Sequence, residues 1–275
     1  MPWREIASSC DFVILMAYDE HSAHNPAGPI ASISWYNKIL QKALNLIPPE
    51  KLVLGVANYA YDWKENSKSA DVLTLQHALI VAQDNMPGEP ASKVIDFDPV
   101  ALNPTFTYED ETGAGHEVWM LDAVTAANQW HIAHNFHIGG AALWVLGSED
   151  PSLWNFFGKG MTRQEFSVTD LQTIKFPYDV EFIGEGEILK VKTSPKEGSR
   201  TIEIDEGTEL AVDEKFTQFP ASFVIGRTGY KPRMVALTLD DGPSKPYTEE
   251  VLDELKKENV RATFFVIGEN ADRFP

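Results

Sequence analysis

Residues 10–21, CDFVILMAYDEH, join a continuous apolar run to a polar end and decide the fold class. A run of this kind is typical of a strand that is buried on both faces of a parallel sheet. Two further runs have the same character, KLVLGVANYAY at residues 51–61 and IGGAALWVL at residues 138–146. We expect helices over residues 34–46, 71–85 and 123–135. The alternation predicts a βαβαβ segment of a parallel α/β sheet.

The pattern changes after residue 158. Segments 180–193, 200–212 and 221–229 alternate apolar with polar residues and break at glycine, which predicts short antiparallel strands with one solvent-exposed face. From residue 231 a buried strand, an amphipathic helix and a second buried strand follow, as at the start of a new α/β domain. We therefore expect three parts, an α/β domain over residues 1–158, a β-rich linker domain over 159–230 and a short α/β unit over 231–275.

Charge and composition exclude several classes of function. The 275 residues include 41 acidic and 23 basic side chains, for a net charge of −18, so the chain would repel a nucleic acid backbone. No apolar run approaches the length of a membrane span. Cys10 is the only cysteine, which excludes an intrachain disulfide and a cysteine-rich zinc site. The seven histidines all precede residue 160, so any chemistry after that point has no imidazole of its own.

Polar and aromatic side chains gather where the predicted parallel strands end, which is where ligands bind in such folds. Tyr18 and Asp19 follow the first run, Tyr59 lies near the end of the second, and Trp144 lies in the third. Rings interleaved with carboxylates suit a sugar, which needs both a stacking surface and hydrogen-bond partners. These aromatic residues could equally be core residues with polar tips.

Four segments resemble family 18 glycoside hydrolases of the spore-germination and cortex-lytic type: MAYDEH (16–21), KLVLGVANYAYDW (51–63), HEVWMLDA (116–123) and GGAALWVLGSEDPSLW (139–154). The resemblance implies a TIM barrel, of which residues 1–158 would be the C-terminal three βα units.

The same resemblance implies roles for particular residues. Met16, Tyr18 and Asp19 would form the substrate motif of the sixth barrel strand, with Tyr18 and Asp19 bound to the N-acetyl group of the sugar. Trp144 would be the floor on which the sugar stacks, and Tyr59 would contribute to substrate binding.

The catalytic signature of that family, D-x-x-D-x-D-x-E, is absent from the sequence. In the family it supplies the general acid, while the N-acetyl oxygen of the substrate is the nucleophile. The acidic cluster at residues 109–111 lacks the spacing, and we expect a solvated loop there. The chain therefore has the substrate-binding residues of a glycosidase without its acid.

Residues 236–244, ALTLDDGPS, place two adjacent carboxylates at the end of a predicted strand. Such a pair can bind a metal and accept a proton from metal-bound water, although the bare pattern is also a good turn. Residues 231–275 resemble the start of NodB-like polysaccharide deacetylases, carbohydrate esterase family 4, and would form the first β-α-β unit of that distorted (β/α) barrel. The resemblance implies that Asp240 is the catalytic base and Asp241 a ligand of a divalent metal, commonly zinc.

In that family two histidines from an H-[ST]-x-x-H motif complete the metal site, and no histidine follows residue 159. One carboxylate is far short of the usual three protein ligands of a catalytic zinc. His131, His134 and His137 are spaced by three and could resemble a metal cluster, but their helix normally covers the outside of a barrel, so we expect surface or packing roles for them.

Taken together, the two resemblances predict an internal part of a bifunctional bacterial protein. It would act on N-acetylglucosamine polysaccharide, such as chitin-like chains, peptidoglycan or poly-N-acetylglucosamine, outside the cytoplasm or at the cell surface. In such proteins a membrane-embedded family 2 glycosyltransferase often follows. We expect the 275-residue chain alone to be inactive. Two alternatives stay open, a non-catalytic glycan-binding or scaffold protein and a deacetylase completed by a partner chain.

Overall fold

The computed structural model describes residues 3–155, 157, 168–175 and 180–275. Contacts divide the chain into two compact units, Met1–Glu181 with Lys192–Val224 and Phe182–Val191 with Ile225–Pro275. The expected boundary near residue 158 lies outside the described residues. None of the helices in the described ranges is long and apolar enough to cross a membrane.

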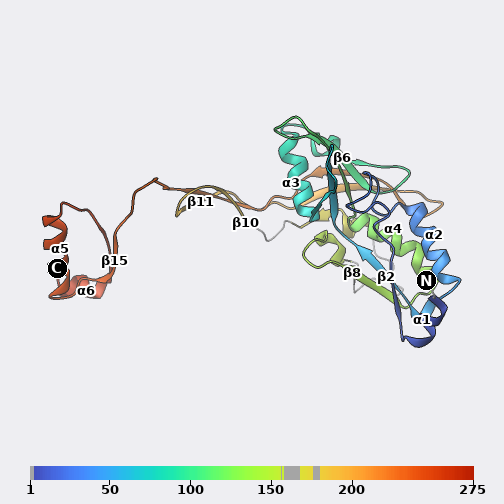
Figure 1. The fold of residues 1–275 in the computed structure, drawn as a ribbon, viewed down its shortest axis with the longest axis horizontal. Coiled ribbons are helices and arrows are strands. Elements are labelled where there is room, and N and C mark those ends of the chain that lie inside the picture. Colours follow the sequence, from blue (N-terminus) through green and yellow to red (C-terminus); the bar gives the residue numbers. More distant parts are fainter. Residues whose placement is uncertain (1–2, 156, 158–167, 176–179) are drawn as a thin grey trace. The chain divides into compact units, whose positions relative to one another are not determined.

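The three apolar runs of the sequence form one parallel sheet in the order β1-β2-β8 (Figure 1). These strands are Val13–Met16 (β1), Leu52–Ala57 (β2) and Gly140–Trp144 (β8). In the register of the sheet, Met16 lies opposite Gly55 and Ala57 lies opposite Trp144, so all three strands end at the same edge. The predicted parallel sheet of a partial α/β barrel is confirmed. The expected burial of each strand on both faces is wrong for β1 and β8, where Ile14, Met16 and Trp144 are exposed.

Helices cover this sheet, and a hydrophobic core lies between the helices and the sheet. They are Trp3–Ser9 (α1), Ile33–Leu44 (α2) and Ala123–His134 (α4). Tyr36 and Leu40 of α2 are fully buried with Leu52 and Leu54 of β2. Burying these side chains provides the main stabilisation of the first unit, at about 25 cal/mol per Å² of apolar surface. Short 3-10 helices are found at Pro49–Lys51, Ala91–Lys93, Pro151–Asn155 and Val168–Leu171.

The apolar run at residues 51–61 is two strands and not one, which corrects the sequence-based expectation. The ladder of β2 ends at Asn58, whose backbone N–H donates to the carbonyl of Trp144 at 3.0 Å. The chain then enters β3, which belongs to a five-stranded antiparallel sheet ordered β4-β3-β7-β6-β5. Its strands are Ala60–Lys64 (β3), Asp71–Leu73 (β4), Asp96–Phe97 (β5), Pro104–Glu109 (β6) and Gly115–Met120 (β7).

The helix expected over residues 71–85 begins later than predicted. Residues 71–73 form β4, and the helix α3 spans Leu75–Asn85. Thr74 caps it, because its Oγ1 accepts a hydrogen bond from the backbone N–H of His77 at 3.1 Å. This helix covers one face of the five-stranded sheet, and a second core lies between them (Figure 1).

A further antiparallel sheet, ordered β13-β12-β9, belongs to the first unit. It consists of Thr173–Ile174 (β9), Gly198–Ile204 (β12) and Ala211–Gln218 (β13). The side-chain amide of Asn128 in α4 exchanges two hydrogen bonds of 2.8 Å with the backbone of Ala211. This packing places Lys192–Val224 with the first unit, whereas the sequence suggested a separate β-rich linker over residues 159–230.

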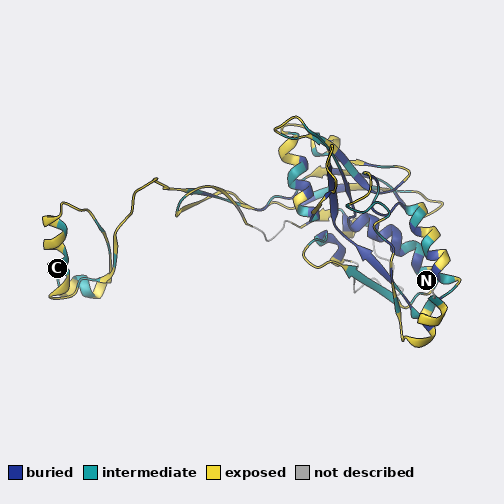
Figure 2. Cartoon of the chain, in the orientation of Figure 1, coloured by how far each residue is buried: buried dark blue, intermediate teal, exposed yellow. Residues whose placement is uncertain are grey.

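The strands at residues 180–184, 188–193 and 223–228 each include residues of both units, and the second unit ends in a βαβ segment. A three-stranded sheet has the order β10-β14-β11, and β15 pairs in parallel with β16 across α5, as predicted. The expected burial of these two strands is wrong, because every residue of β15 and β16 is exposed or intermediate. The elements are Val180–Gly184 (β10), Ile188–Thr193 (β11), Phe223–Thr228 (β14), Thr238–Gly242 (β15), Tyr247–Lys257 (α5), Thr263–Val266 (β16) and Gly268–Arg273 (α6). Neither α5 nor α6 has a buried residue, and Figure 2 shows this segment as exposed or intermediate throughout.

Candidate functional site

Asp19 lies just beyond β1 and binds the segment that follows β2. Its backbone is in the left-handed region, with φ of 63°, where aspartate is one of the few tolerated non-glycine residues. Its Oδ1 accepts hydrogen bonds from the hydroxyls of Tyr59 and Tyr61, the latter at 3.0 Å. The carboxylate therefore links residues that are about forty positions apart in the chain.

The tyrosines around Asp19 are held in the neutral form. Burial, followed by the hydrogen bond to Asp19, raises the pKa of Tyr59. Burial and then the charge of Asp19 raise the pKa of Tyr61 and of Tyr18. Because the neutral phenol is the favoured form, Tyr59 and Tyr61 act as donors and Asp19 as the acceptor.

A row of aromatic rings leads away from this carboxylate. The ring centroids are 6.4 Å apart for Tyr18 and Tyr59, 5.2 Å for Tyr59 and Tyr61, and 5.3 Å for Tyr61 and Trp63. All three contacts are edge-to-face, the arrangement that ring quadrupoles favour. Gly55 makes room for the first ring, because a Cβ there would lie 3.3 Å from Cε1 of Tyr18. Tyr59, Tyr61 and Trp63 are buried, so the row is a packed cluster with only Tyr18 partly exposed.

Two large apolar side chains are exposed at the edge where the parallel strands end. The exposed fraction is 56% for Trp144, the last residue of β8, and 69% for Met16, the last of β1. Exposed apolar groups next to fixed polar groups are typical of binding surfaces. The structure therefore brings all five predicted substrate residues to one sheet edge. Tyr18, Asp19 and Tyr59 contact one another, and their roles in binding stay predictions.

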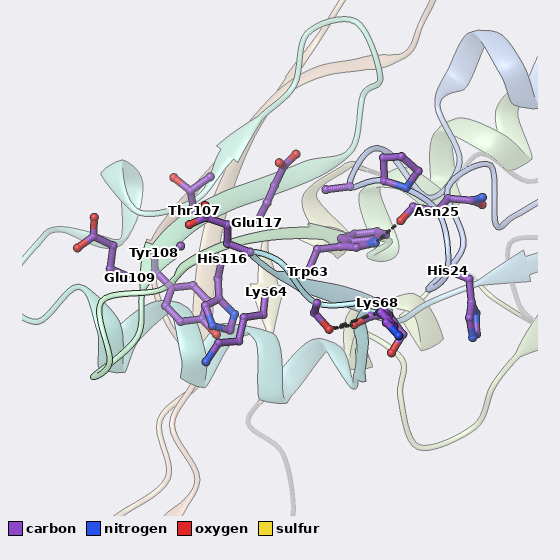
Figure 3. Close-up of a pocket in the computed structure, with 16 residues that line it drawn as sticks. His24, Asn25, Trp63, Lys64, Lys68, Thr107, Tyr108, Glu109, His116 and Glu117 are labelled. Carbon is purple, nitrogen blue, oxygen red and sulfur yellow. Dashed lines mark hydrogen bonds between the residues drawn. The ribbon is translucent and has the colours of Figure 1, made fainter.

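A pocket of about 940 Å³ extends beyond Trp63 (Figure 3). Trp63, Glu117 and Thr107 lie directly opposite one another on β3, β7 and β6, and all three line it. The Trp63 indole N–H donates to the carbonyl of Asn25 at 2.9 Å, so a loop after β1 forms another wall. Thr107 and Glu117 are not among the binding residues that the sequence predicts. The alternation of residues 105–109 is the signal that indicates a strand with one polar face.

A polar network around His116 lies on the same strands, and Lys64, Tyr108 and His116 of this network also line the pocket (Figure 3). Nδ1 of His116 lies 2.7 Å from Oδ1 of Asp62, and Nε2 of the same ring lies 3.4 Å from Oδ2 of Asp110. Tyr108 stacks on the imidazole with centroids 4.4 Å apart and donates its hydroxyl to Asp62 at 2.6 Å. Hydrogen bonding, first of all from Lys64, holds the pKa of Asp110 well below its usual range. Glu109 and Glu111 are exposed, as expected for a solvated loop, whereas Asp110 between them closes a turn and binds this network.

Asp240 and Asp241 lie at the exposed end of β15 in the second unit. Asp241 has a left-handed backbone with φ of 63°, and its carbonyl accepts a hydrogen bond of 3.0 Å from Asn270. Within the described ranges no three His, Cys, Asp or Glu side chains are grouped so that they could hold a metal ion. The donors present at this loop therefore do not fit a catalytic metal.

Two of the three histidines near the end of α4 contact other side chains. His131 Nε2 lies 3.6 Å from the carboxylate of Glu209. The His134 ring lies 5.5 Å from the ring of Trp130. His137 follows the helix, in a left-handed backbone conformation with φ of 54°.

Comparison with known proteins finds a different family match for each end of the chain. Residues 1–149 match the family model of glycosyl hydrolases family 18, and residues 227–275 match that of polysaccharide deacetylase. Both resemblances predicted from the sequence are confirmed.

Individual relatives agree with the two family models. The cortical fragment-lytic enzyme of Bacillus anthracis is 31% identical over 157 residues, which are 55% of this chain and 35% of that protein. The peptidoglycan-N-acetylglucosamine deacetylase of Bacillus cereus is 56% identical over 46 residues, 17% of each chain. The crystal structure of a chitinase from Chromobacterium violaceum matches with a TM-score of 0.50 and 26% identity, covering 58% of this chain and 49% of that one. The chain thus spans less than half of each of these proteins.

Proposed function

Because the chain belongs to glycosyl hydrolases family 18, we propose that its first unit binds an N-acetylglucosamine polysaccharide at the edge where β1, β2 and β8 end. The observation that supports this most directly is the carboxylate of Asp19, fixed by two neutral tyrosines at the same sheet edge as the exposed indole of Trp144. An amino sugar needs such a combination of an apolar platform and an oriented polar group.

Each residue has a distinct task in this proposal. Oδ1 of Asp19 is occupied by Tyr59 and Tyr61, whereas Oδ2 makes no hydrogen bond with another described residue. Oδ2 would accept the amide N–H of the N-acetyl group, with Tyr18 at its side. Trp144 would stack on the apolar face of the sugar ring, and Met16 would line the same edge.

The reaction we propose for the longer protein is hydrolysis of the β-1,4 link, assisted by the N-acetyl oxygen of the substrate. That reaction requires a general acid, and the sequence of this chain lacks the D-x-x-D-x-D-x-E signature that provides it in the family. We therefore propose that the 275-residue chain binds the polysaccharide without cleaving it. The names of the relatives support a substrate of the peptidoglycan or chitin class, encountered outside the cytoplasm or at the cell surface.

For the second unit we propose the start of a polysaccharide N-deacetylase, with Asp240 as the base and Asp241 as one metal ligand. Enzymes of this family are generally metal-dependent. Zinc is the metal we propose for the complete domain. The described residues include no group of three donors that could hold it, so Asp241 would need further ligands from other residues.

Binding of the β-1,4-linked tetramer of N-acetylglucosamine, measured by isothermal titration calorimetry on the 275-residue chain, tests the first proposal. Trp144→Ala should lower the affinity by about tenfold, the loss of roughly 1.4 kcal/mol expected for an aromatic contact residue. Trp154→Ala is the matched control, because Trp154 is also exposed, at 44%, and lies outside the proposed edge residues. Equal losses in both variants, or an unsubstituted chain without affinity, would contradict the proposal.

A non-catalytic glycan-binding or scaffold role is the second candidate. It is favoured by the presence of all five predicted binding residues together with the absence of the acid signature. Hydrolysis of the tetramer by the full-length protein would exclude it, whereas binding without hydrolysis would support it.

A further inference from the structure

A fully buried arginine connects the β12-β13 hairpin to the sheet that bears the candidate site. The Arg200 side chain is 0% exposed and is surrounded by three carboxylates. Its Nη1 lies 3.0 Å from Asp122 and 2.9 Å from Glu214, and its Nη2 lies 2.8 Å from Asp150. Arg200 lies outside residues 1–149, which the family 18 model matches.

The hydrogen bonds continue from these carboxylates to Asn58. The backbone N–H of Asp150 donates to Oδ1 of Asn58 at 2.8 Å, and Nδ2 of Asn58 donates to the carbonyl of Asp122 at 2.9 Å. Arg200 thus contacts the side chains of the two residues whose backbones bind the Asn58 amide. Asn58 is itself 0% exposed, so each of these bonds forms away from water, where an unmade bond is costly.

Asn58 stands between two of the predicted substrate residues. It precedes Tyr59, which donates to Asp19, and its backbone N–H donates to the carbonyl of Trp144. A shift of Asn58 would therefore move the phenol and the indole relative to each other. Displacements of about 1 Å at such groups are enough to reduce function strongly.

The cluster of Arg200, Asp122, Asp150 and Glu214 depends on the charges of its members. Burial raises the pKa of the Glu214 carboxyl well above its usual range, so its neutral form is favoured. The guanidinium also contacts the carboxyl groups of Asp122 and Asp150. A buried ion group of this kind is strongly destabilised when one partner is removed, because the remaining charges lose their compensation. The planar guanidinium also fixes both carboxylates at once, which the single ammonium group of a lysine cannot do.

We propose that Arg200 is a positioning residue of the saccharide site, which acts through Asp122, Asp150 and Asn58 to hold Tyr59 and Trp144 in place. The inference rests on the proposed binding function. It makes the β12-β13 hairpin, expected from the sequence to be part of a linker, a component of the saccharide-binding unit.

Three variants of the 275-residue chain test this role. Arg200→Met removes the guanidinium and keeps a long side chain, while Arg200→Lys keeps one charge. Arg227→Met is the matched control, because Arg227 forms a partly exposed ion pair with Glu187 in the second unit. All are compared at a temperature where circular dichroism shows them folded.

Two measurements are made on each variant, the affinity for the N-acetylglucosamine tetramer and the hydrogen exchange of peptides that cover residues 52–59. For Arg200→Met we expect an affinity about tenfold lower and faster exchange at residues 52–59, with unchanged exchange in α2. Arg200→Lys should lie between this variant and the unsubstituted chain, and Arg227→Met should match the unsubstituted chain.

A double variant distinguishes positioning through Asn58 from a general loss of structure. The double variant combines Arg200→Met with Asn58→Ala. If Arg200 acts through Asn58, the double variant should bind no more weakly than the weaker-binding of the two single variants. The reason is that the effects of substitutions within one network do not add. Additive losses would overturn the inference, as would a folded Arg200→Met chain with unchanged exchange at residues 52–59. If both Arg200 variants unfold, Arg200 is a folding determinant alone and the inference also fails.

The two proposals fail in different ways. An unsubstituted chain that does not bind the tetramer contradicts the binding function, while the exchange of residues 52–59 still reports whether Arg200 fixes Asn58. A chain that binds the tetramer equally well with and without Arg200 contradicts only the positioning role.

Discussion

The hydroxyl of Tyr61 donates a hydrogen bond to Oδ1 of Asp19 at 3.0 Å, although the two residues are 42 positions apart in the chain. Tyr61 belongs to the antiparallel sheet and Asp19 follows the parallel one. This bond therefore joins the parallel sheet to the five-stranded antiparallel sheet at the point where the candidate saccharide site lies.

Replacing Asp19 by asparagine should weaken saccharide binding without unfolding the chain. The amide oxygen can still accept from the tyrosines, but the charge that strengthens a hydrogen bond to an amide N–H is lost. We expect an affinity for the N-acetylglucosamine tetramer that is about three- to tenfold lower, measured by calorimetry. Asp11→Asn serves as a control, because Asp11 is an exposed acid before β1. An affinity that is unchanged in Asp19→Asn would contradict the role of this carboxylate.

The folded state should lose stability as the pH rises above 10. Burial raises the pKa of Tyr36, Tyr59 and Tyr61 above the ordinary value of 10.0, so these phenols stay protonated in the folded chain while the unfolded chain releases their protons. Fewer protons bound to the unfolded state means that the free energy of unfolding falls with pH. Thermal melts followed by circular dichroism between pH 8 and pH 11, values chosen to bracket the ordinary tyrosine pKa of about 10, should show a midpoint that begins to fall near pH 10.

Tyr36→Phe separates this effect from the titration of exposed groups. The variant loses the buried phenol, whose hydroxyl donates to the carbonyl of Gln129 at 3.1 Å, and its melting temperature should depend less steeply on pH above 10. If the melting temperature falls equally steeply with pH in Tyr36→Phe and in the unsubstituted chain, other groups cause the loss of stability.

Gly55→Ala should destabilise the first unit by about 1–3 kcal/mol, the usual effect of overpacking. A Cβ at this position would lie 2.8 Å from the carbonyl oxygen of Leu15 and 3.3 Å from Cα of Met16, and both are backbone atoms that cannot move freely. Gly115→Ala is the control, because its nearest neighbour is a Glu65 side-chain oxygen at 3.6 Å. Urea denaturation should place the midpoint of Gly55→Ala clearly below that of Gly115→Ala, and equal midpoints would contradict the close packing of β1 on β2.

Added zinc should not make the 275-residue chain release acetate. The described residues provide no group of three donors that could hold a metal, and no histidine follows residue 159. Acetate is measured enzymatically after incubation with the N-acetylglucosamine tetramer, with and without zinc and with Asp241→Asn as the comparison. Zinc-dependent release that disappears in Asp241→Asn would show that the chain assembles a working metal site.

Several features could be predicted from the sequence because they depend on local pattern. The parallel strands at residues 13–16 and 140–144 are continuous apolar runs, and the polar residues after them reach the same edge because parallel strands end together. The segment at residues 51–61 was misjudged because Tyr59, Ala60 and Tyr61 prolong the apolar run, while the strand change depends on Asn58, whose bonds to Trp144 and Asp122 come from distant parts of the chain.

By itself the sequence determined the α/β fold class at both ends of the chain. It also determined the positions of the aromatic and acidic residues and the absence of histidine after residue 159. Only the tertiary structure decided that Tyr59 and Tyr61 share the carboxylate of Asp19, and that Arg200 is buried among Asp122, Asp150 and Glu214. The physical reason is that the energy of a buried polar group depends on its partners, and partners separated by tens of residues leave no periodic signal in the chain.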